Sequence, residues 1–328
     1  MNLTEFNQSD GCDHFSCPER SVSPAVYILL YVCSAAVVLL TVCGNLLVII
    51  SVLYFKQLHT PTNMLLLSLA VSDFLVGLFV MPFHFTWLIE SCWMFGHIFC
   101  ILFNFMSFQL TSVSVGNVVL ISLDRYMALS NPFLYLKDIT SKIVHTLIGL
   151  SWVFSFLYNF VFFYVNGNFT DLFLCPGECL VSTYDEVGSV IDLIFIVVIP
   201  CSLMLVLYFQ VFVIARRHAN AIRDLNQNKK NISKNVSEVM KSERKAAKVL
   251  GILVFVFLGC LVPYYICTLM SNTASSYIVI NNILILFYLN SSINPVIYAL
   301  FYSWFQKCTK MILSCKILHT DCSFVNVV

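Results

Sequence analysis

Seven long apolar stretches, joined by short polar segments, constrain this chain more than any other feature of its sequence. A helix that crosses a bilayer needs roughly 20 mainly apolar residues, because lipid offers backbone amides and carbonyls no hydrogen-bond partner outside their own helix. Each stretch meets that length, so the sequence predicts an all-α membrane protein, a bundle of seven transmembrane helices. The stretches are Val26–Phe55, Met64–Leu88, Ile98–Leu129, Ile143–Val165, Val187–Ala215, Ala246–Met270 and Tyr277–Tyr302.

The composition agrees, because charged residues make up 11% of the chain and hydrophobic residues 59%, whereas about a quarter of a soluble domain is charged. We expect an amino-terminal segment over residues 1–22, a seven-helix domain over 23–302 and a tail over 303–328. Residues 218–241 form the one long polar insertion, which we expect to be a solvated loop. Residues 1–22 lack the apolar region of a signal peptide, so the first helix is expected to be the membrane anchor.

A short amphipathic helix is predicted directly after the seventh stretch. Apolar and basic residues alternate there at helical spacing, which is typical of a helix that lies on the inner leaflet. Cysteines in this position are candidates for palmitoylation. The apolar residues are Trp304, Phe305, Met311 and Ile312, the basic ones Lys307 and Lys310, and the cysteines Cys308, Cys315 and Cys322.

The charge distribution predicts the orientation in the plasma membrane. Lys and Arg gather in cytoplasmic loops, and of the 18 in this chain only Arg20 lies on the same face as the amino terminus. That face is therefore predicted to be extracellular. Its acids either concentrate cationic ligands at the mouth of the bundle or only reinforce the topology. They are Glu5, Asp10, Asp13, Glu19, Glu90, Asp171, Glu178, Asp185 and Glu186.

Cysteine and asparagine usage agrees with this orientation. Six cysteines lie on the oxidising outer side, where disulfides persist, although sequence alone does not fix their pairing. Three glycosylation sequons, at Asn2, Asn7 and Asn168, also fall outside. The outer cysteines are Cys12, Cys17, Cys92, Cys100, Cys175 and Cys179.

Charged side chains within the stretches are few, and each is a candidate for function because a charge at the bilayer centre costs about 2.5–3.5 kcal/mol. Asp73 lies midway along the second stretch. Polar residues at a similar depth indicate either a site for a sodium ion or a hydrogen-bonded network that locks the bundle. These residues are Asn45, Ser114, Asn290 and Asn294.

Asp192 lies in the outer half of the fifth stretch, where no Lys or Arg of any stretch lies at the same depth. His84 is the one titratable protein partner that we can propose. A buried carboxylate without a cation is protonated or faces a cavity that receives a cationic ligand. We favour the ligand over a structural His84–Asp192 pair, because buried membrane charges mark substrate sites.

Polar and aromatic residues in other stretches are candidates to complete this site. Ser107 and Thr111 share one face of the third stretch with Ser114. The rings of Tyr264, Tyr265 and Tyr288 suit an ammonium group through cation–π contact. Packing between helices is an equally ordinary role for at least one of these tyrosines.

A charged motif, Asp124-Arg125-Tyr126, ends the third stretch on the cytoplasmic side. Glu243 begins the sixth helix on the same face. An Arg neutralised by two acids can act as a latch between these helices that a conformational change releases.

Each of the seven stretches carries a short motif, and the series resembles the rhodopsin-like (class A) G-protein-coupled receptors. Asn290 to Phe305 fits the pattern NSxxNPxxYxxxYxWF, which is similar to the fingerprint of trace amine-associated receptors. Glu243 to Lys248 (ERKAAK) and Cys175 to Cys179 (CPGEC) also resemble that family. The seven motifs are Gly44-Asn45, Leu69-Ala70-Val71-Ser72-Asp73, Asp124-Arg125-Tyr126, Trp152, Pro200 with Tyr208, Pro263, and Asn294-Pro295-Val296-Ile297-Tyr298.

The resemblance implies a receptor for volatile or biogenic amines, in many members an olfactory one, that signals through a stimulatory heterotrimeric G protein and cyclic AMP. It also implies that Arg125 forms, with Tyr208 and Tyr298, the inner contact that changes on activation. Together with placement on the outer face, it implies two disulfides. They are Cys100 to Cys179, and Cys175 to Cys17 with Cys12 as the rival partner.

Two positions depart from the family pattern. Ser107 stands where most aminergic receptors have the Asp that holds the amine. Family members without that Asp can keep an acid at the position of Asp192, so we expect the charged end of the amine to point toward the fifth helix. Leu261 stands where the family's CWxP motif has Trp, so the rotamer-switch account of activation does not transfer.

Other functional classes have less support. A receptor for a non-amine small molecule, with Asp192 in a structural role, is the main alternative. A transporter would show broken helices, and an opsin needs a Lys in the seventh helix. We find no nucleophile–base pair or metal-ligand spacing, so we expect no enzyme and no metal, and we expect membrane lipid but no nucleic acid as a partner.

Overall fold

The computed structural model describes Cys17, residues 23–165, Cys179, and residues 190–227, 234–270 and 274–314. Seven helical segments in this part of the chain are long and apolar enough to cross a membrane, which confirms the predicted seven-helix bundle. They are Pro24–Tyr54, Pro61–Glu90, Gly96–Ser130, Ser141–Val165, Val190–Arg217, Lys248–Cys267 and Asn282–Phe301.

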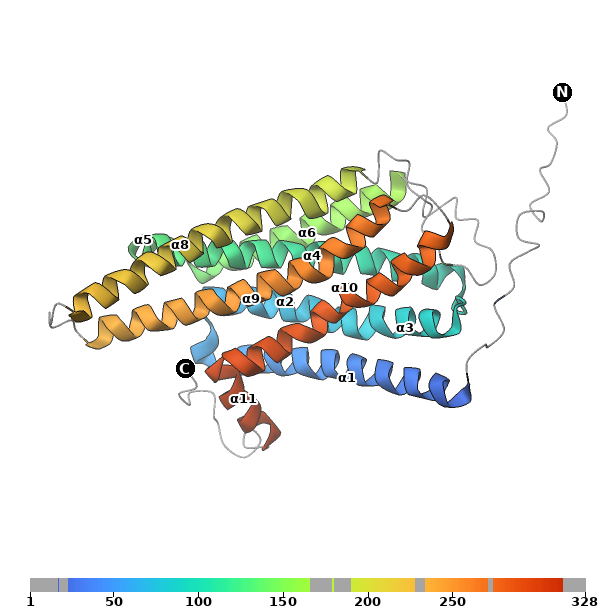
Figure 1. The fold of residues 1–328 in the computed structure, drawn as a ribbon, viewed down its shortest axis with the longest axis horizontal. Helices are drawn as coiled ribbons and strands as arrows, with labels where there is room; N and C mark the ends of the chain where they lie inside the picture. Colours follow the sequence, from blue (N-terminus) through green and yellow to red (C-terminus); the bar gives the residue numbers. More distant parts are fainter. Residues whose placement is uncertain are drawn as a thin grey trace, which may run out of the picture.

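The long helices lie side by side along one direction, and a short last helix is turned across the end of the bundle (Figure 1). The first span is α1 (Pro24–Tyr54), the third α4 (Gly96–Ser130) and the fourth α6 (Ser141–Val165). The sixth span lies in α9 (Lys234–Met270) and the seventh in α10 (Ala274–Phe301), followed by α11 (Ser303–Leu313).

The second and fifth spans each contain a π-helical turn. The second consists of α2 (Pro61–Leu75), the π-turn η2 (Val76–Val80) and α3 (Met81–Glu90). The fifth contains the π-turn η3 (Leu193–Val198) and continues as α8 (Ile199–Gln227). Because a π-turn changes which face the following residues present, side chains beyond it do not keep the alignment of a regular helix.

Local sequence signals explain where α2 and the short helix after α4 begin. At the start of α2 the Thr60 hydroxyl accepts a hydrogen bond from the Asn63 amide, and Pro61 occupies the first helical position. Asn131 caps the short helix α5 (Pro132–Asp138) in the same way, ahead of Pro132. Both caps lie between membrane spans, where the backbone must turn.

The third helix, α4, is the centre of the bundle, since it packs against α2, α6 and α8. One large buried cluster joins the inner halves of the helices, and a second, outer cluster surrounds Trp93, Phe103 and Tyr288. The lipid-facing surfaces carry large apolar side chains such as Phe255, which is 78% exposed. Such a surface is stable only in a bilayer.

The polar insertion at 218–241 is helical for most of its length, which corrects the expectation of a solvated loop. Helix α8 continues to Gln227 and α9 begins at Lys234. The sequence on both sides is rich in Ala, Arg, Lys and Glu, which favour helix even when all faces are polar. The prediction failed because it took a polar sequence as evidence for a loop.

The amphipathic helix after the seventh span is present as α11. Trp304, Phe305 and Cys308 are buried in the inner cluster, and α11 packs against α1 and α10. Cys308 is therefore a packing residue in this structure rather than an accessible thiol. The other two palmitoylation candidates, Cys315 and Cys322, lie outside the described residues.

Two disulfides join residues that the structure describes. Cys100, in the first turns of α4, is joined to Cys179, as the resemblance implied. Cys17 is joined to Cys92, between α3 and α4, which corrects the expected Cys17–Cys175 bridge. Sequence could not show this, because all the outer cysteines share one compartment. Cys12, Cys175 and the sequons at Asn2, Asn7 and Asn168 lie outside the described residues.

The contact between α1 and α10 predicts that Gly44→Ala destabilises the protein. An added Cβ would lie 2.8 Å from Cβ of Pro295, and overpacking of this kind costs about 1–3 kcal/mol. Gly149→Ala in α6 is the matched control, because nothing lies within 4 Å of its added Cβ. In detergent, we expect Gly44→Ala to lower the thermal midpoint by several degrees and Gly149→Ala to leave it unchanged or higher. Equal midpoints would contradict close α1–α10 packing.

Candidate functional site

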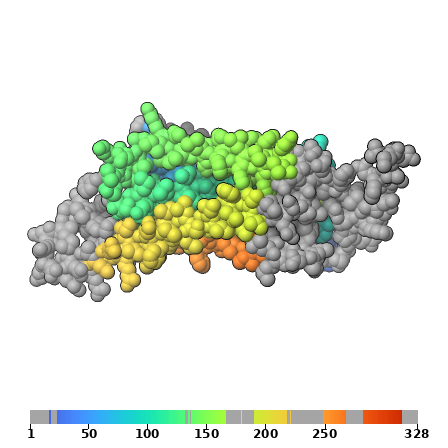
Figure 2. All heavy atoms as spheres, turned by 90° about the horizontal axis from the view of Figure 1, so that it is seen from above, coloured from blue at the N-terminus to red at the C-terminus, as the bar shows by residue number. Residues whose placement is uncertain are grey.

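Asp192 is a buried carboxylate in the fifth span, with 5% of its surface exposed. It directly precedes the π-turn η3. The hydroxyl of Tyr158, in α6, donates a hydrogen bond of 3.1 Å to its Oδ1 atom. The fourth and fifth spans border one face of the molecule (Figure 2), and this polar contact joins them.

The alternative of a structural His84–Asp192 pair is wrong. His84 is fully buried in α3, where its ring lies 4.9 Å from that of Tyr288 and is stacked on Phe103. Within the described part of the chain, the side-chain donor to Asp192 is Tyr158. Sequence reasoning missed Tyr158, because the rotation of the fourth helix relative to the fifth cannot be read from an apolar stretch that lacks a clear polar face.

The other predicted ligand residues fall into two groups. His84 of α3 and Tyr288 of α10 come together with ring centroids 4.9 Å apart, and Ser107 of α4 lies near the Tyr288 hydroxyl. Tyr264 and Tyr265 pack edge to face with each other in α9, with ring centroids 5.1 Å apart. The structure thus places Asp192 in contact with Tyr158 and gathers three other predicted residues into a separate cluster.

The side chains of Ser107 and Thr111 are hydrogen-bonded to the backbone of their own helix, α4. The Ser107 hydroxyl donates to the Phe103 carbonyl, and the Thr111 hydroxyl donates to the Ser107 carbonyl, both at 2.7 Å. Neither serves as a hydrogen-bond donor to Asp192 in this structure. Both hydroxyls keep an oxygen that can accept a hydrogen bond.

A small cavity lies in the middle of the bundle. Its size suits a water molecule or an ion rather than an organic ligand. It connects the predicted ligand residues, represented by Thr111 and Tyr288, with the polar residues Ser114 and Asn290. The complete lining is Val76, Leu110, Thr111, Ser114, Phe257, Cys260, Leu261, Phe287, Tyr288, Asn290 and Ser291.

Asp73 is the centre of a buried polar network. Its Oδ1 accepts from Ser291 at 2.8 Å and its Oδ2 from the Asn294 amide at 2.7 Å. The Asn45 amide donates to the Ser291 carbonyl, and Ser114 is bonded to Ser72 beside Asp73. The network joins α1, α2, α4 and α10. Ser291, which sequence reasoning did not single out, donates directly to the Asp73 carboxylate, as Asn294 does.

The same network contains oxygens suited to a monovalent cation. The side-chain carbonyl oxygens of Asn45 and Asn290 are buried without a hydrogen-bond donor among the described residues. Asn290 and Ser291 also line the cavity. Buried acceptors beside a carboxylate lower their free energy by meeting a cation or a water molecule.

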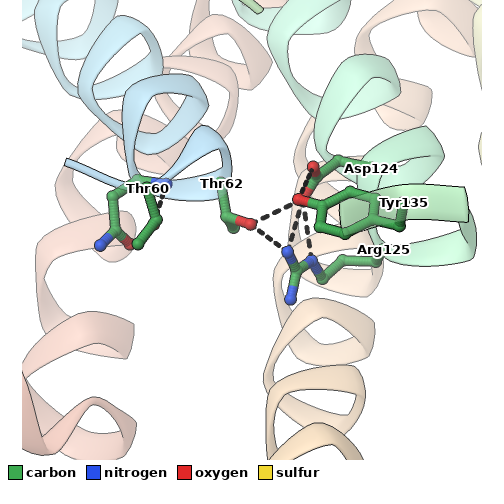
Figure 3. Close-up of polar contacts among 6 residues, drawn as sticks. Thr60, Thr62, Asp124, Arg125 and Tyr135 are labelled. Atoms are coloured by element: carbon green, nitrogen blue, oxygen red, sulfur yellow. Dashed lines mark hydrogen bonds and ion pairs between the residues drawn. The ribbon is translucent and has the colours of Figure 1, made fainter. Parts of the chain in front are cut away.

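The Asp124-Arg125-Tyr126 motif forms a compact cluster with residues of two other helices (Figure 3). Asp124 and Arg125 form an ion pair of 2.6 Å at the inner end of α4. Thr62 of α2 donates to Asp124 Oδ2 at 2.8 Å and also accepts from Arg125. Tyr135 of α5 donates to Asp124 Oδ1 at 2.7 Å. Arg125 is thereby held to α2 in this conformation.

Tyr135 belongs to the short helix between the third and fourth spans. Burial and the negative charge of Asp124 raise the pKa of its hydroxyl to about 12. It therefore remains a neutral donor at physiological pH. Sequence reasoning missed both Tyr135 and Thr62, because neither belongs to the charged motif.

Three other predicted switch residues have described contacts of their own. Tyr298 is fully buried against Tyr302 and Phe305, and the Tyr208 hydroxyl lies over Gly251 between α8 and α9. Tyr126 packs beside Leu129 and Val211. Glu243 lies in α9, but its side chain falls outside the described residues, so the latch to the sixth helix stays a prediction.

Comparison with known proteins gives the family. Residues 44–298 match the 7 transmembrane receptor (rhodopsin family) model. The chain is 36% identical over 340 residues to trace amine-associated receptor 13c of Danio rerio, covering 100% of this chain and 98% of that protein. It is 37% identical over 324 residues to trace amine-associated receptor 1 of Homo sapiens, covering 94% of each. The chain therefore belongs to the rhodopsin family of seven-transmembrane receptors and, within it, to the trace amine-associated receptors.

Proposed function

We propose that this receptor detects small amines through a charge pair between the ligand's ammonium group and Asp192. The observation that carries the proposal is a buried carboxylate whose hydrogen-bond donor among the described residues is the neutral phenol of Tyr158. A phenol satisfies one lone pair but supplies no positive charge. A carboxylate held this way in a membrane gains stability from a cation.

Family membership supports the coarser part of this proposal. The chain is a receptor and not an enzyme, a multi-pass protein of the plasma membrane. Its family implies an amine ligand and coupling to a G protein. An extracellular amino terminus, a stimulatory G protein with cyclic AMP, contact with membrane lipid and an olfactory role are our proposals, and they rest on the loop charges and the resemblance.

A second candidate function follows from the same hydrogen bond. If the Tyr158 contact satisfies Asp192 fully, the carboxylate is structural and the receptor reads a non-amine small molecule. The cluster of His84, Ser107 and Tyr288 would then be the polar end of the site. Screening mono- and diamines against cells that express the chain, with a cyclic AMP readout and a G-protein-independent recruitment assay, separates the two functions.

The Asp124–Arg125–Thr62–Tyr135 cluster supports a switch at the cytoplasmic end. We propose that activation releases Arg125 from Thr62 and Asp124, so that the guanidinium turns toward Tyr208, Tyr298 and the G protein. The Asp73 network is proposed to hold a sodium ion with help from Asn45 and Asn290.

Asp192→Asn is expected to eliminate amine responses while surface expression persists. Asn keeps the volume and accepts the Tyr158 hydrogen bond, but it has no charge. Loss of one partner of a desolvated charge pair costs about 2–5 kcal/mol, on the order of 30-fold to several thousand-fold in potency. Ser107→Ala is the control and should change potency little, since a neutral hydrogen bond contributes about 1 kcal/mol.

Concentration–response curves, with surface level measured by an amino-terminal tag, check this prediction. Equal potency in wild type and Asp192→Asn for an active amine would refute the counter-ion role. Combining Asp192→Asn with Ser107→Asp moves the acid to the third helix. Partial recovery is expected if the ligand cavity lies between the third and fifth spans.

Arg125→Ala is expected to abolish G-protein output with surface expression preserved, because no other described cation lies in this cluster. Tyr135→Phe is the matched variant, since it removes one hydrogen bond to Asp124 and leaves the ion pair. It should shift basal and agonist-stimulated output without abolishing either. A full agonist response in Arg125→Ala would overturn the assignment.

The sodium proposal predicts that NaCl stabilises the solubilised receptor more than an equal concentration of KCl does. KCl is the suitable comparison, because an organic cation would itself be a candidate ligand. Asp73→Asn should remove the difference between the two salts in thermal midpoint. The absence of a difference in wild type would leave Asp73 as a purely structural network.

A further inference from the structure

Tyr158 fixes one of the two oxygens of Asp192. Its hydroxyl approaches Oδ1 at 3.1 Å, while Oδ2 receives no hydrogen bond from the residues that the structure describes. A phenol has a single proton to donate. The two oxygens of the carboxylate are therefore unequal before any ligand arrives.

The ring of Tyr158 is held in place by aromatic neighbours. It is stacked on Phe162 with ring centroids 6.0 Å apart and an interplanar angle of 16°. The ring of Phe195 in the fifth span also lies beside it, with ring centroids 6.3 Å apart, and Phe162 in turn is stacked on Phe108 of α4. This row of rings restricts where the hydroxyl can point.

The backbone beside Tyr158 is also fixed. Asn159 is fully buried, and its amide donates to Gln109 Oε1 at 3.2 Å and Ser112 Oγ at 3.1 Å in α4. A third bond to the Ser155 carbonyl orients the same amide within α6. These hydrogen bonds fix the position of α6 along α4. Because Tyr158 is the neighbour of Asn159 in α6, its position along the bundle is fixed as well.

We propose that Tyr158 is a positioning residue that turns Asp192 so that Oδ2 is the single acceptor for a ligand's ammonium group. The proposal rests on the function proposed above for Asp192. A single acceptor oxygen needs only one N–H from the ligand. The site would then accept primary amines and their N-methylated derivatives with similar affinity, since each protonated form keeps at least one N–H.

Tyr158→Phe tests this, because it removes the hydroxyl and keeps the ring. The probes are 2-phenylethylamine and its N,N-dimethyl derivative, replaced by the most potent primary amine of the screen and its N,N-dimethyl derivative if that amine is the stronger agonist. We expect a rise in EC50 of about 10-fold for the primary amine, in line with the loss of a hydrogen bond to a charged group.

The potency of the tertiary amine should fall more than that of the primary amine. The ratio of their EC50 values should therefore shift by about 3-fold or more. With both oxygens open, a primary ammonium can donate two hydrogen bonds and recover part of the loss, whereas a tertiary ammonium has one N–H. General loosening of the bundle would weaken both amines equally. The ratio is therefore independent of expression level and of folding.

Tyr164→Phe is the matched control, since Tyr164 lies in the same helix with 68% of its surface exposed, and its EC50 values should stay within 2-fold of wild type. Tyr158→His restores an N–H donor and should return the ratio toward wild type. Unchanged EC50 values in Tyr158→Phe, or an equal rise for both amines, would overturn the positioning role while Asp192→Asn still abolishes the response. Equal potency of wild type and Asp192→Asn would instead remove the proposed function and this inference with it.

Discussion

The inability of lipid to hydrogen-bond is the constraint on which this structure depends. It forces the backbone into helices that satisfy their own amides and carbonyls, and it makes a buried polar side chain costly unless that side chain finds a partner inside the bundle. The polar contacts are therefore concentrated at a few places between apolar surfaces. Asp192 with Tyr158, the network around Asp73, and the cluster around Asp124 and Arg125 are three such places, at successive depths from the outer half of the bundle to its cytoplasmic end.

Helix α4 links these three places mechanically. Near its middle it is fastened to α6 through Gln109 and Ser112, a few residues further along it contacts the Asp73 network through Ser114, and close to its last turn it carries the Asp124–Arg125 pair. A small movement of α6 or the fifth span against α4 would therefore change contacts along the same helix. Packed helices of this kind have discrete arrangements rather than continuous ones, which suits a receptor that passes a signal from one side of the membrane to the other.

The sequence predicted the parts of the fold that depend on composition along the chain. Apolar length identified all seven spans, and alternation after Tyr302 identified α11. It failed where the answer depends on how helices are rotated against each other or which loops meet. His84 was named by depth as the alternative partner of Asp192, yet it packs on Tyr288, and Tyr158 had no distinguishing signal among the aromatic residues of its span. The Cys17–Cys92 disulfide was also missed. Disulfide pairing depends on the course of the loops, and that course leaves no periodic pattern in the sequence.

The absence of an acid at Ser107 has a physical consequence for the outer half of the bundle. In a site with its counter-ion on the third helix, the charge lies at the centre of the bundle; here it lies where the fifth span borders α6 (Figure 2). His84, Ser107 and Tyr288 lie between α3, α4 and α10, and they can donate and accept hydrogen bonds but carry no fixed negative charge. A ligand with one ammonium group would place that group beside the fifth span and its neutral end toward Tyr288. In the amine site proposed above, the second ammonium of a diamine would face this cluster, where none of the three described side chains is a carboxylate, at a cost in desolvation. If the proposed amine function holds, the charges of the described residues therefore favour a ligand with a single ammonium group.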